Sequence, residues 1–180
     1  YLMHTGYREI SGVKYPSLGS IVCAEAKEGP QSDLPGYISL NGKGGGPGFY
    51  GAKYSPLSTY AGAEIPNIEP PLPHKLMDSR LSALDVLDSR FASATQSEFA
   101  DTHNEMYGRA IRFSRSSLAK LLDPKSTDAK NLTPYGNTQF ARACYTAKRL
   151  IAEGGVRFIE IEHSGWDIHS NNNYEVARQC

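Results

Sequence analysis

Residues 140–161 read FARACYTAKRLIAEGGVRFIEI, and this stretch determines the fold class. Apolar residues at helical spacing predict a helix over about 137–153, ended by Gly154 and Gly155. Its inward face is expected to consist of Phe140, Cys144, Ala147, Leu150 and Ile151. The β-branched run 156–161 then predicts a strand, which we expect to be central and parallel in its sheet. A helix, a glycine stop, a strand and a polar loop in this order are typical of an α/β sheet.

The segments upstream predict further elements of the same class. Ser17 is a good N-cap for a helix that runs to about Gly29, and residues 37–40 predict a short strand. A glycine loop at 42–51 and a proline-rich segment at 55–74 follow, and the second is expected to run as extended chain over the surface. Two helices come next, with predicted apolar faces at Leu76, Leu81, Leu84 and Leu87 in the first and at Phe99, Met106, Ala110, Phe113, Leu118 and Leu121 in the second.

The whole pattern predicts a single α/β domain over 1–180, with a central, mainly parallel sheet flanked by helices. Residues 55–134 form a proline-rich excursion and a helical insertion in this scheme. The two ends read as a helix's last turn, closed by Gly6, and as the first turns of another helix at 174–180. We therefore expect the middle portion of a longer fold, truncated at both ends, although both ends fraying is the alternative. Unpaired sheet edges in such a fragment would favour self-association.

The composition argues against several kinds of partner. Lys and Arg number 19 and Asp and Glu number 19, so the net charge is zero and no broad attraction to nucleic acid is expected. No window approaches the roughly 18 consecutive apolar residues of a membrane span, and there is no basic-then-apolar leader. Three widely separated cysteines, Cys23, Cys144 and Cys180, fit neither a disulfide framework nor a zinc knuckle.

The glycine loop contains a literal match to G-x-G-x-x-G at 46–51. A dinucleotide site requires this motif to open a helix, and Pro56 prevents one here, so we expect no nucleotide cofactor. Two interpretations remain for the loop: a flexible segment near a substrate or a plain surface excursion, and the sequence alone favours the second.

The segment that follows the last predicted strand carries the most chemistry. Asp167 and His169 are two residues apart, so in an extended loop both side chains can face one cation. Carboxylate oxygen and imidazole nitrogen together suit zinc, manganese or iron, and the carboxyl end of a strand is where open α/β sheets bind ligands. The alternative is a polar loop in which Asn173 caps the next helix.

Three neighbours are expected to support this metal pair rather than to bind the cation. Trp166 is a candidate wall of the site, and Glu162 and His163 precede the turn at Gly165. The catalytic residues themselves are not identified, because no G-x-S-x-G elbow is present and His4 carries only a weak signal. The thiols of Cys23 and Cys144 are expected to be inert.

The run at 140–161, followed by GWDIHSNN at 165–172, resembles a large bacterial family of sulfatase-like proteins. That family carries a domain-of-unknown-function label and is placed in the alkaline phosphatase superfamily. Further matches are LMHTG at 2–6, PSLG at 16–19, LPG at 34–36 and GFYGA at 48–52. The resemblance covers nearly the whole chain, and G-W-D-x-H-x-N-N is its most specific part.

The resemblance implies an alkaline phosphatase-like fold that binds one or two divalent cations, zinc, manganese or similar, at its strand ends. These cations would activate a nucleophile and stabilise the oxyanion leaving a small phosphate or sulfate ester. Asp167 and His169 match the family's D-x-H metal pair, while the nucleophile would lie before Tyr1. The resemblance also implies an exported or periplasmic protein. We expect this chain to be inactive by itself, and the alternative is a non-catalytic exported binding or structural protein.

Overall fold

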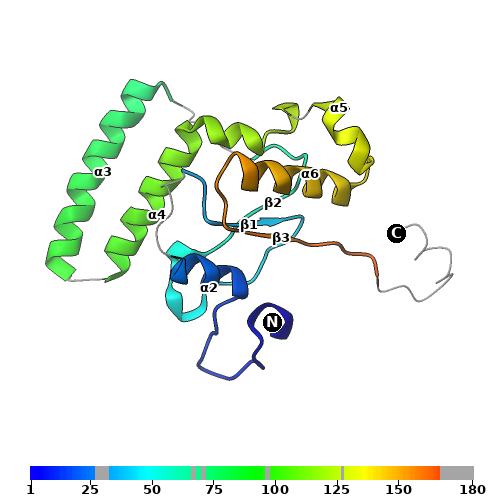
Figure 1. Ribbon diagram of the computed structural model, residues 1–180. Helices are drawn as coiled ribbons and strands as arrows, with labels where there is room; N and C mark the ends of the chain where they lie inside the picture. The colour runs from blue at the N-terminus through cyan, green and yellow to red at the C-terminus, as the bar shows by residue number, and fades with distance from the viewer. Residues whose placement is uncertain (27–32, 66–67, 70–71, 96–97, 127, 167–180) are drawn as a thin grey trace.

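The computed structural model describes residues 1–26, 33–65, 68–69, 72–95, 98–126 and 128–166 (Figure 1). Its three strands are β1 (Tyr37–Leu40), β2 (Leu57–Thr59) and β3 (Phe158–Ile161). Its α-helices are α1 (Leu2–Thr5), α2 (Leu18–Glu25), α3 (His74–Thr95), α4 (Glu98–Arg115), α5 (Ala129–Leu132) and α6 (Gln139–Ala152). Short 3₁₀ helices are η1 (Gly48–Tyr50), η2 (Ala52–Tyr54), η3 (Ser117–Leu121), η4 (Pro124–Ser126) and η5 (Thr133–Tyr135).

The three strands form a parallel sheet in the order β2-β1-β3. This confirms the α/β class and the parallel sheet flanked by helices. The prediction that β3 is central is wrong, because β1 lies between the other two. All four residues of β1 are buried, whereas those of β3 are only partly covered. The strand that the sequence missed is β2, which follows Pro56 in the segment expected to be extended surface chain.

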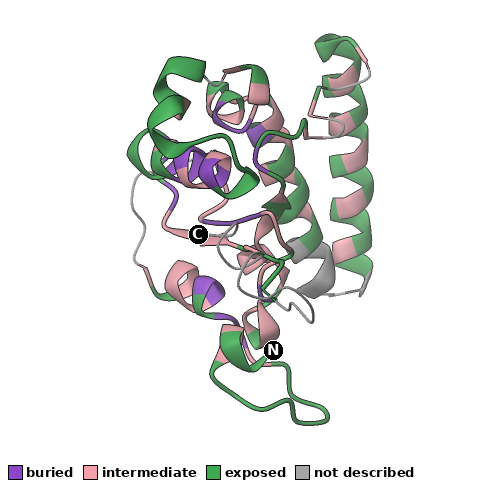
Figure 2. Ribbon diagram, turned by 90° about the vertical axis from the view of Figure 1, so that its right-hand side faces the viewer, coloured by how far each residue is buried: buried purple, intermediate pink, exposed green. Residues whose placement is uncertain are grey.

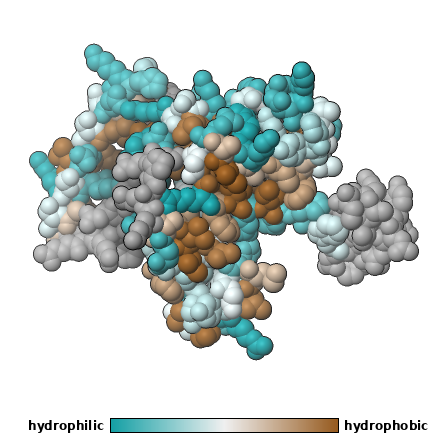
Figure 3. All heavy atoms as spheres, in the orientation of Figure 1, coloured by the Kyte–Doolittle hydropathy of each residue, from teal (hydrophilic) through white to brown (hydrophobic). Residues whose placement is uncertain are grey.

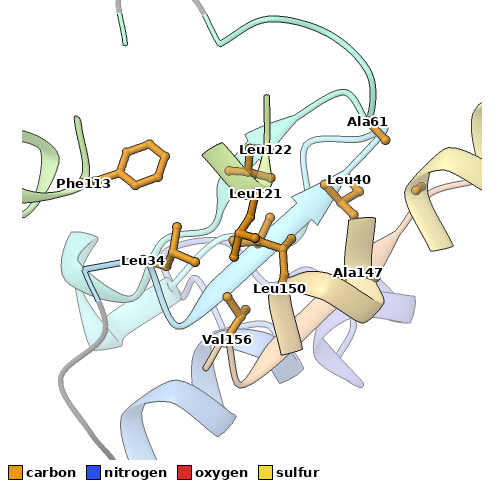
Figure 4. Packing of buried hydrophobic residues seen from close by; sticks show 11 residues of the cluster. Leu34, Leu40, Ala61, Phe113, Leu121, Leu122, Ala147, Leu150 and Val156 are labelled. Atoms are coloured by element: carbon orange, nitrogen blue, oxygen red, sulfur yellow. The ribbon is translucent and has the colours of Figure 1, made fainter. Parts of the chain in front are cut away.

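The two faces of the sheet differ in chemistry. Side chains alternate along a strand, so the register groups Ile38 and Leu40 with Ile159 on one face. Ile38 and Leu40 belong to a buried apolar cluster that includes Leu150 of α6 (Figure 4), and Ile159 packs against this cluster. In Figure 1, α6 lies on one side of the sheet and α2 on the other. The face toward α2 carries the polar residues Ser39, Ser58 and Glu160 together with Tyr37 and Phe158, whose rings meet edge to face.

Helix α6 confirms the predicted helix but not all of its predicted inward face. Thr138 caps it by accepting a hydrogen bond from the backbone of Ala141 at 3.0 Å. Leu150 is fully buried and Ala147 is buried, whereas Phe140 and Ile151 are 41% and 59% exposed. The buried face instead consists of Ala141, Ala143, Tyr145, Thr146, Ala147 and Leu150. Small residues dominate it, and they let the helix lie close to the sheet.

The two amino-terminal helices, α1 and α2, are short. A glycine closes the first, and a serine caps the start of the second. Gly6 closes α1 in the left-handed conformation with φ 73°, as predicted. The side chain of Ser17 caps α2 by accepting from the backbone N–H of Ser20. Helix α2 ends at Glu25, before the predicted limit at Gly29, and Leu18 at its start is exposed.

The two long helices α3 and α4 lie side by side and project from the sheet (Figure 1). Figure 2 shows mostly exposed and intermediate residues along this pair, while buried residues gather in the sheet and α6. Of the predicted inward residues in this pair, Leu76, Leu87, Met106 and Ala110 are exposed, whereas Phe113 is buried. Within the described residues, no helix has the length and apolar character to cross a membrane.

The packing of α6 gives a stability prediction with a matched control. Leu150→Ala should lower the free energy of unfolding by about 2–5 kcal/mol, because it leaves a cavity in the core. Ile151→Ala, one residue further along the same helix, should stay within about 0.5 kcal/mol, because that side chain faces solvent. Urea unfolding of both variants checks this, and equal losses in the two would contradict the observed orientation of α6.

Candidate functional site

The carboxyl edge of the sheet brings several polar segments together. Strand β1 leads into Asn41 and the glycine loop, and β3 leads into Glu162 and His163. The side chain of Asn41 accepts from the backbone N–H of Ala61 at 3.1 Å and from Nε2 of Gln139 at 3.0 Å. Asn41 thus joins the ends of β1 and β2 to the first residue of α6, and it fixes the geometry of this edge.

The predicted metal ligands, Asp167 and His169, lie outside the described residues. Strand β3 ends at Ile161 at the carboxyl edge, and residues 162–166 continue the described chain as far as Trp166. The convergence of the two side chains on a cation stays a prediction. Within the described part of the chain, no three His, Cys, Asp or Glu side chains gather as a metal site.

His163 packs between two aromatic side chains. Its ring centroid lies 4.9 Å from that of Phe140 and 5.3 Å from that of Trp166. Its Nε2 atom is buried and has no hydrogen-bond partner among the described residues. A buried polar atom without a partner costs about 1–3 kcal/mol, so a hydrogen-bond or metal partner at this nitrogen would be stabilising. Phe140, expected in the core, is 41% exposed and packs against His163 instead.

Glu162 is exposed and lies against the glycine loop. A Cβ atom added to Gly42 would overlap the Glu162 carboxylate, so only glycine allows the loop to approach β3 this closely. The contact places a carboxylate at the carboxyl edge. The supporting role of Glu162 beside the metal pair stays a prediction.

The polar face of the sheet carries a network that the sequence did not predict. Nδ1 of His4 lies 3.0 Å from Oε1 of Glu160. The hydroxyl of Tyr37 donates to Oε2 of Glu160 at 2.6 Å and accepts from the backbone N–H of Gly45 at 3.0 Å. Three segments far apart in the chain, α1, β1 and β3, therefore meet around one carboxylate.

The protonation of this network follows from its geometry. Burial raises the pKa of the Tyr37 hydroxyl far above its usual range, and the hydrogen bond to Glu160 raises it further. Tyr37 therefore stays a donor. A carboxylate only accepts, so we expect the His4 nitrogen that lies 3.0 Å from it to carry the ring hydrogen. Within the described residues, Nε2 of His4 has no partner, and a carboxylate behind the ring is how proteins orient an imidazole that binds a metal or transfers a proton.

The glycine loop is packed against this network. The hydroxyl of Ser17 donates to the carbonyl of Gly45 at 3.1 Å, and the backbone N–H of Ser17 donates to the carbonyl of Gly46 at 2.9 Å. Gly45 is buried, and a Cβ atom on it would collide with Ser17 and His4. The loop is therefore packed at Gly45, whereas Lys43 and Gly46 are exposed at the surface. Beyond them, residues 48–54 form the 3₁₀ helices η1 and η2 rather than the α-helix of a dinucleotide site.

The free thiol of Cys23 is half-buried, and burial raises its pKa, which opposes the thiolate form. This agrees with an inert cysteine. No sequence signal distinguished His4 or Glu160, because their pairing depends on the strand register and on the fold of α1. The only available hint was alternation in β3, which places Glu160 on the face opposite Ile159 and Ile161.

The comparisons with known proteins identify a family. The family model described as "Protein of unknown function (DUF1501)" matches residues 1–180. No curated protein and no solved structure gives a significant match.

Removal of the Tyr37 hydroxyl should destabilise the protein. Tyr37→Phe leaves Glu160 and the backbone N–H of Gly45 each without one partner, at an expected cost of about 1–3 kcal/mol. Tyr60→Phe is the control, because Tyr60 is 62% exposed, and it should leave the unfolding midpoint unchanged. Chemical denaturation at neutral pH checks both, and equal midpoints in the two variants would contradict the network.

The raised pKa of Tyr37 also predicts a dependence on alkaline pH. The folded state holds the hydroxyl proton more tightly than the unfolded chain does, so this contribution is complete below about pH 10 and is lost as the pH rises beyond it. The wild type should therefore lose stability in this range more steeply than Tyr37→Phe. Parallel curves of unfolding free energy against pH for the two proteins would be the contrary result.

Proposed function

This chain belongs to the DUF1501 family, whose function is unknown, and we propose that it is part of a metal-dependent hydrolase of phosphate or sulfate esters. In this proposal Asp167 and His169 bind a divalent cation at the carboxyl edge of the sheet. The supporting observation is that β3, which carries Glu160 opposite His4, ends at this edge, with residues 162–166 between the strand and Asp167. The kinship with sulfatase-like proteins of the alkaline phosphatase superfamily is part of the proposal and rests on the sequence resemblance.

The donor atoms suit the proposed cation. One carboxylate and one imidazole match the preferences of zinc and manganese, but a catalytic zinc site uses three protein ligands and an open position. His163 supports this fit, because its Nε2 is buried without a partner among the described residues, close to the proposed ligands in the chain. The cation would activate the attacking group and stabilise the leaving oxyanion.

His4 is the group best placed to move a proton at this edge. Its Nδ1 faces Glu160, so its Nε2 can take a proton from a donor or return it. Glu160 acts as a positioning residue, since it orients the ring, and Tyr37 in turn holds Glu160. The glycine loop packs beside this group through Gly45, which gives the substrate a backbone wall of small residues.

A second candidate function is a non-catalytic binding protein, exported like the proposed hydrolase. One observation favours it: the aromatic residues Phe49 and Tyr60 are 67% and 62% exposed in and after the glycine loop. Exposed aromatic side chains are typical of contact surfaces. Such a protein would need neither a cation nor the proton-transfer group, so metal content separates the two candidates.

The metal assignment predicts a loss of bound cation in two variants. In the intact protein, Asp167→Ala and His169→Ala should each lower the metal content well below one per chain, because each removes a ligand. His74→Ala is the control, since His74 is exposed at the start of α3. Elemental analysis of the purified proteins measures this. Unchanged metal in both variants would end the assignment and leave the loop as a helix-capping turn.

A further inference from the structure

A cavity of about 600 Å³ lies on the outer side of α6, between α5, η5 and α6. The helices α5 and α6 lie side by side there (Figure 1). The charged and aromatic residues that line it are Lys130, Tyr135, Tyr145, Lys148, Arg149 and Glu153. The cavity is remote from the proposed metal edge. Gln139, at the amino end of α6, contacts Asn41 at that edge, and Arg149 is ten residues further, about 15 Å along the axis.

The charges around the cavity are unbalanced. Lys130, Lys148 and Arg149 supply three positive charges against the one carboxylate of Glu153, which leaves a net charge of +2. Arg149 is the fixed member, because its Nε lies 3.5 Å from Glu153 and its side chain also donates to Ser126 at 3.2 Å. In the part of the chain that the structure describes, neither lysine ammonium has an ion-pair partner.

Two tyrosine rings form the aromatic part of the lining and contact each other. The rings of Tyr135 and Tyr145 meet edge to face, with centroids 5.6 Å apart, and Arg149 lies over the ring of Tyr145 at 5.9 Å. Tyr145 is buried, whereas Tyr135 is partly open to solvent. Within the described residues, neither hydroxyl makes a hydrogen bond, so both are available to a ligand together with the lysine ammonium groups.

We propose that this cavity binds a small organic dianion, in which a phosphate or phosphonate group is attached to an aromatic or otherwise planar body. The oxyanion would take hydrogen bonds from Lys130, Lys148 and a tyrosine hydroxyl, since charged donors bind oxyanions most strongly. The planar body would lie against the tyrosine rings. The net charge of +2 matches a dianion and favours it over a monoanion of the same shape.

The test is a titration of the ¹⁵N-labelled chain, in a metal-free buffer with chelator, so that no cation at the sheet edge contributes. Phenylphosphonate is the probe, above its second pKa, and it contains no ester bond to hydrolyse. Benzenesulfonate carries the same ring with one negative charge, and inorganic phosphate carries the charge without the ring. We expect shifts at Lys130, Tyr145 and Lys148, with phenylphosphonate binding about tenfold more tightly than either comparison ligand.

Variants locate the site. Lys148→Gln should weaken phenylphosphonate binding about tenfold, and Tyr145→Phe should weaken it while it keeps the ring in place. Lys75→Gln, which changes an exposed lysine on α3, should have no effect. Equal binding of benzenesulfonate, equal binding of inorganic phosphate, or an unchanged affinity in Lys148→Gln would each overturn the proposal. Since the buffer is metal-free, none of these results depends on whether Asp167 and His169 bind a cation.

Discussion

The carboxylate of Glu160 is the group around which the polar side of this fold is organised. Strand alternation turns it away from the apolar core, onto the face that α2 covers. A carboxylate that is largely removed from water is costly unless other groups compensate its charge and its lone pairs. Tyr37 donates to one of its oxygens, and His4 faces the other at 3.0 Å. Glu160 therefore links α1 to the sheet, beside the packing of His4 against Gly45.

The two faces of the sheet make different contributions: one forms the apolar core, and the other carries a hydrogen-bonded polar network. On one face, Ile38, Leu40 and Leu150 form a dry core, in which small residues of α6 allow close packing. On the other face, buried polar groups are joined to each other and to the backbone of the glycine loop. Figure 3 shows apolar side chains grouped over the middle of the molecule with hydrophilic ones around them. Stability comes mainly from the first face, and the candidate chemistry lies at the carboxyl edge of the second.

Local sequence rules predicted the elements well and their environment less well. The helix 139–152 and the parallel strand after it followed from periodicity and from the glycine stop, but Ile151 and Phe140 were assigned to the wrong face. Periodicity selects apolar positions and does not say which of them a neighbouring element covers. Strand β2 was missed because it has only three residues and follows a proline. The pairing of Glu160 with His4 could not be predicted from local sequence rules, because it depends on strand register and on a contact between distant segments.

The tautomer of His4 is the most direct test of the contact between His4 and Glu160. If Glu160 orients this ring, ¹⁵N NMR of the neutral imidazole should show the hydrogen on Nδ1 and no hydrogen on Nε2. The same spectrum of Glu160→Gln should then lose this preference, because the amide offers both a donor and an acceptor to the ring. Two results would contradict the proposed orientation of His4 by Glu160. One is hydrogen on Nε2 in the wild type, and the other is a tautomer mixture that Glu160→Gln leaves unchanged.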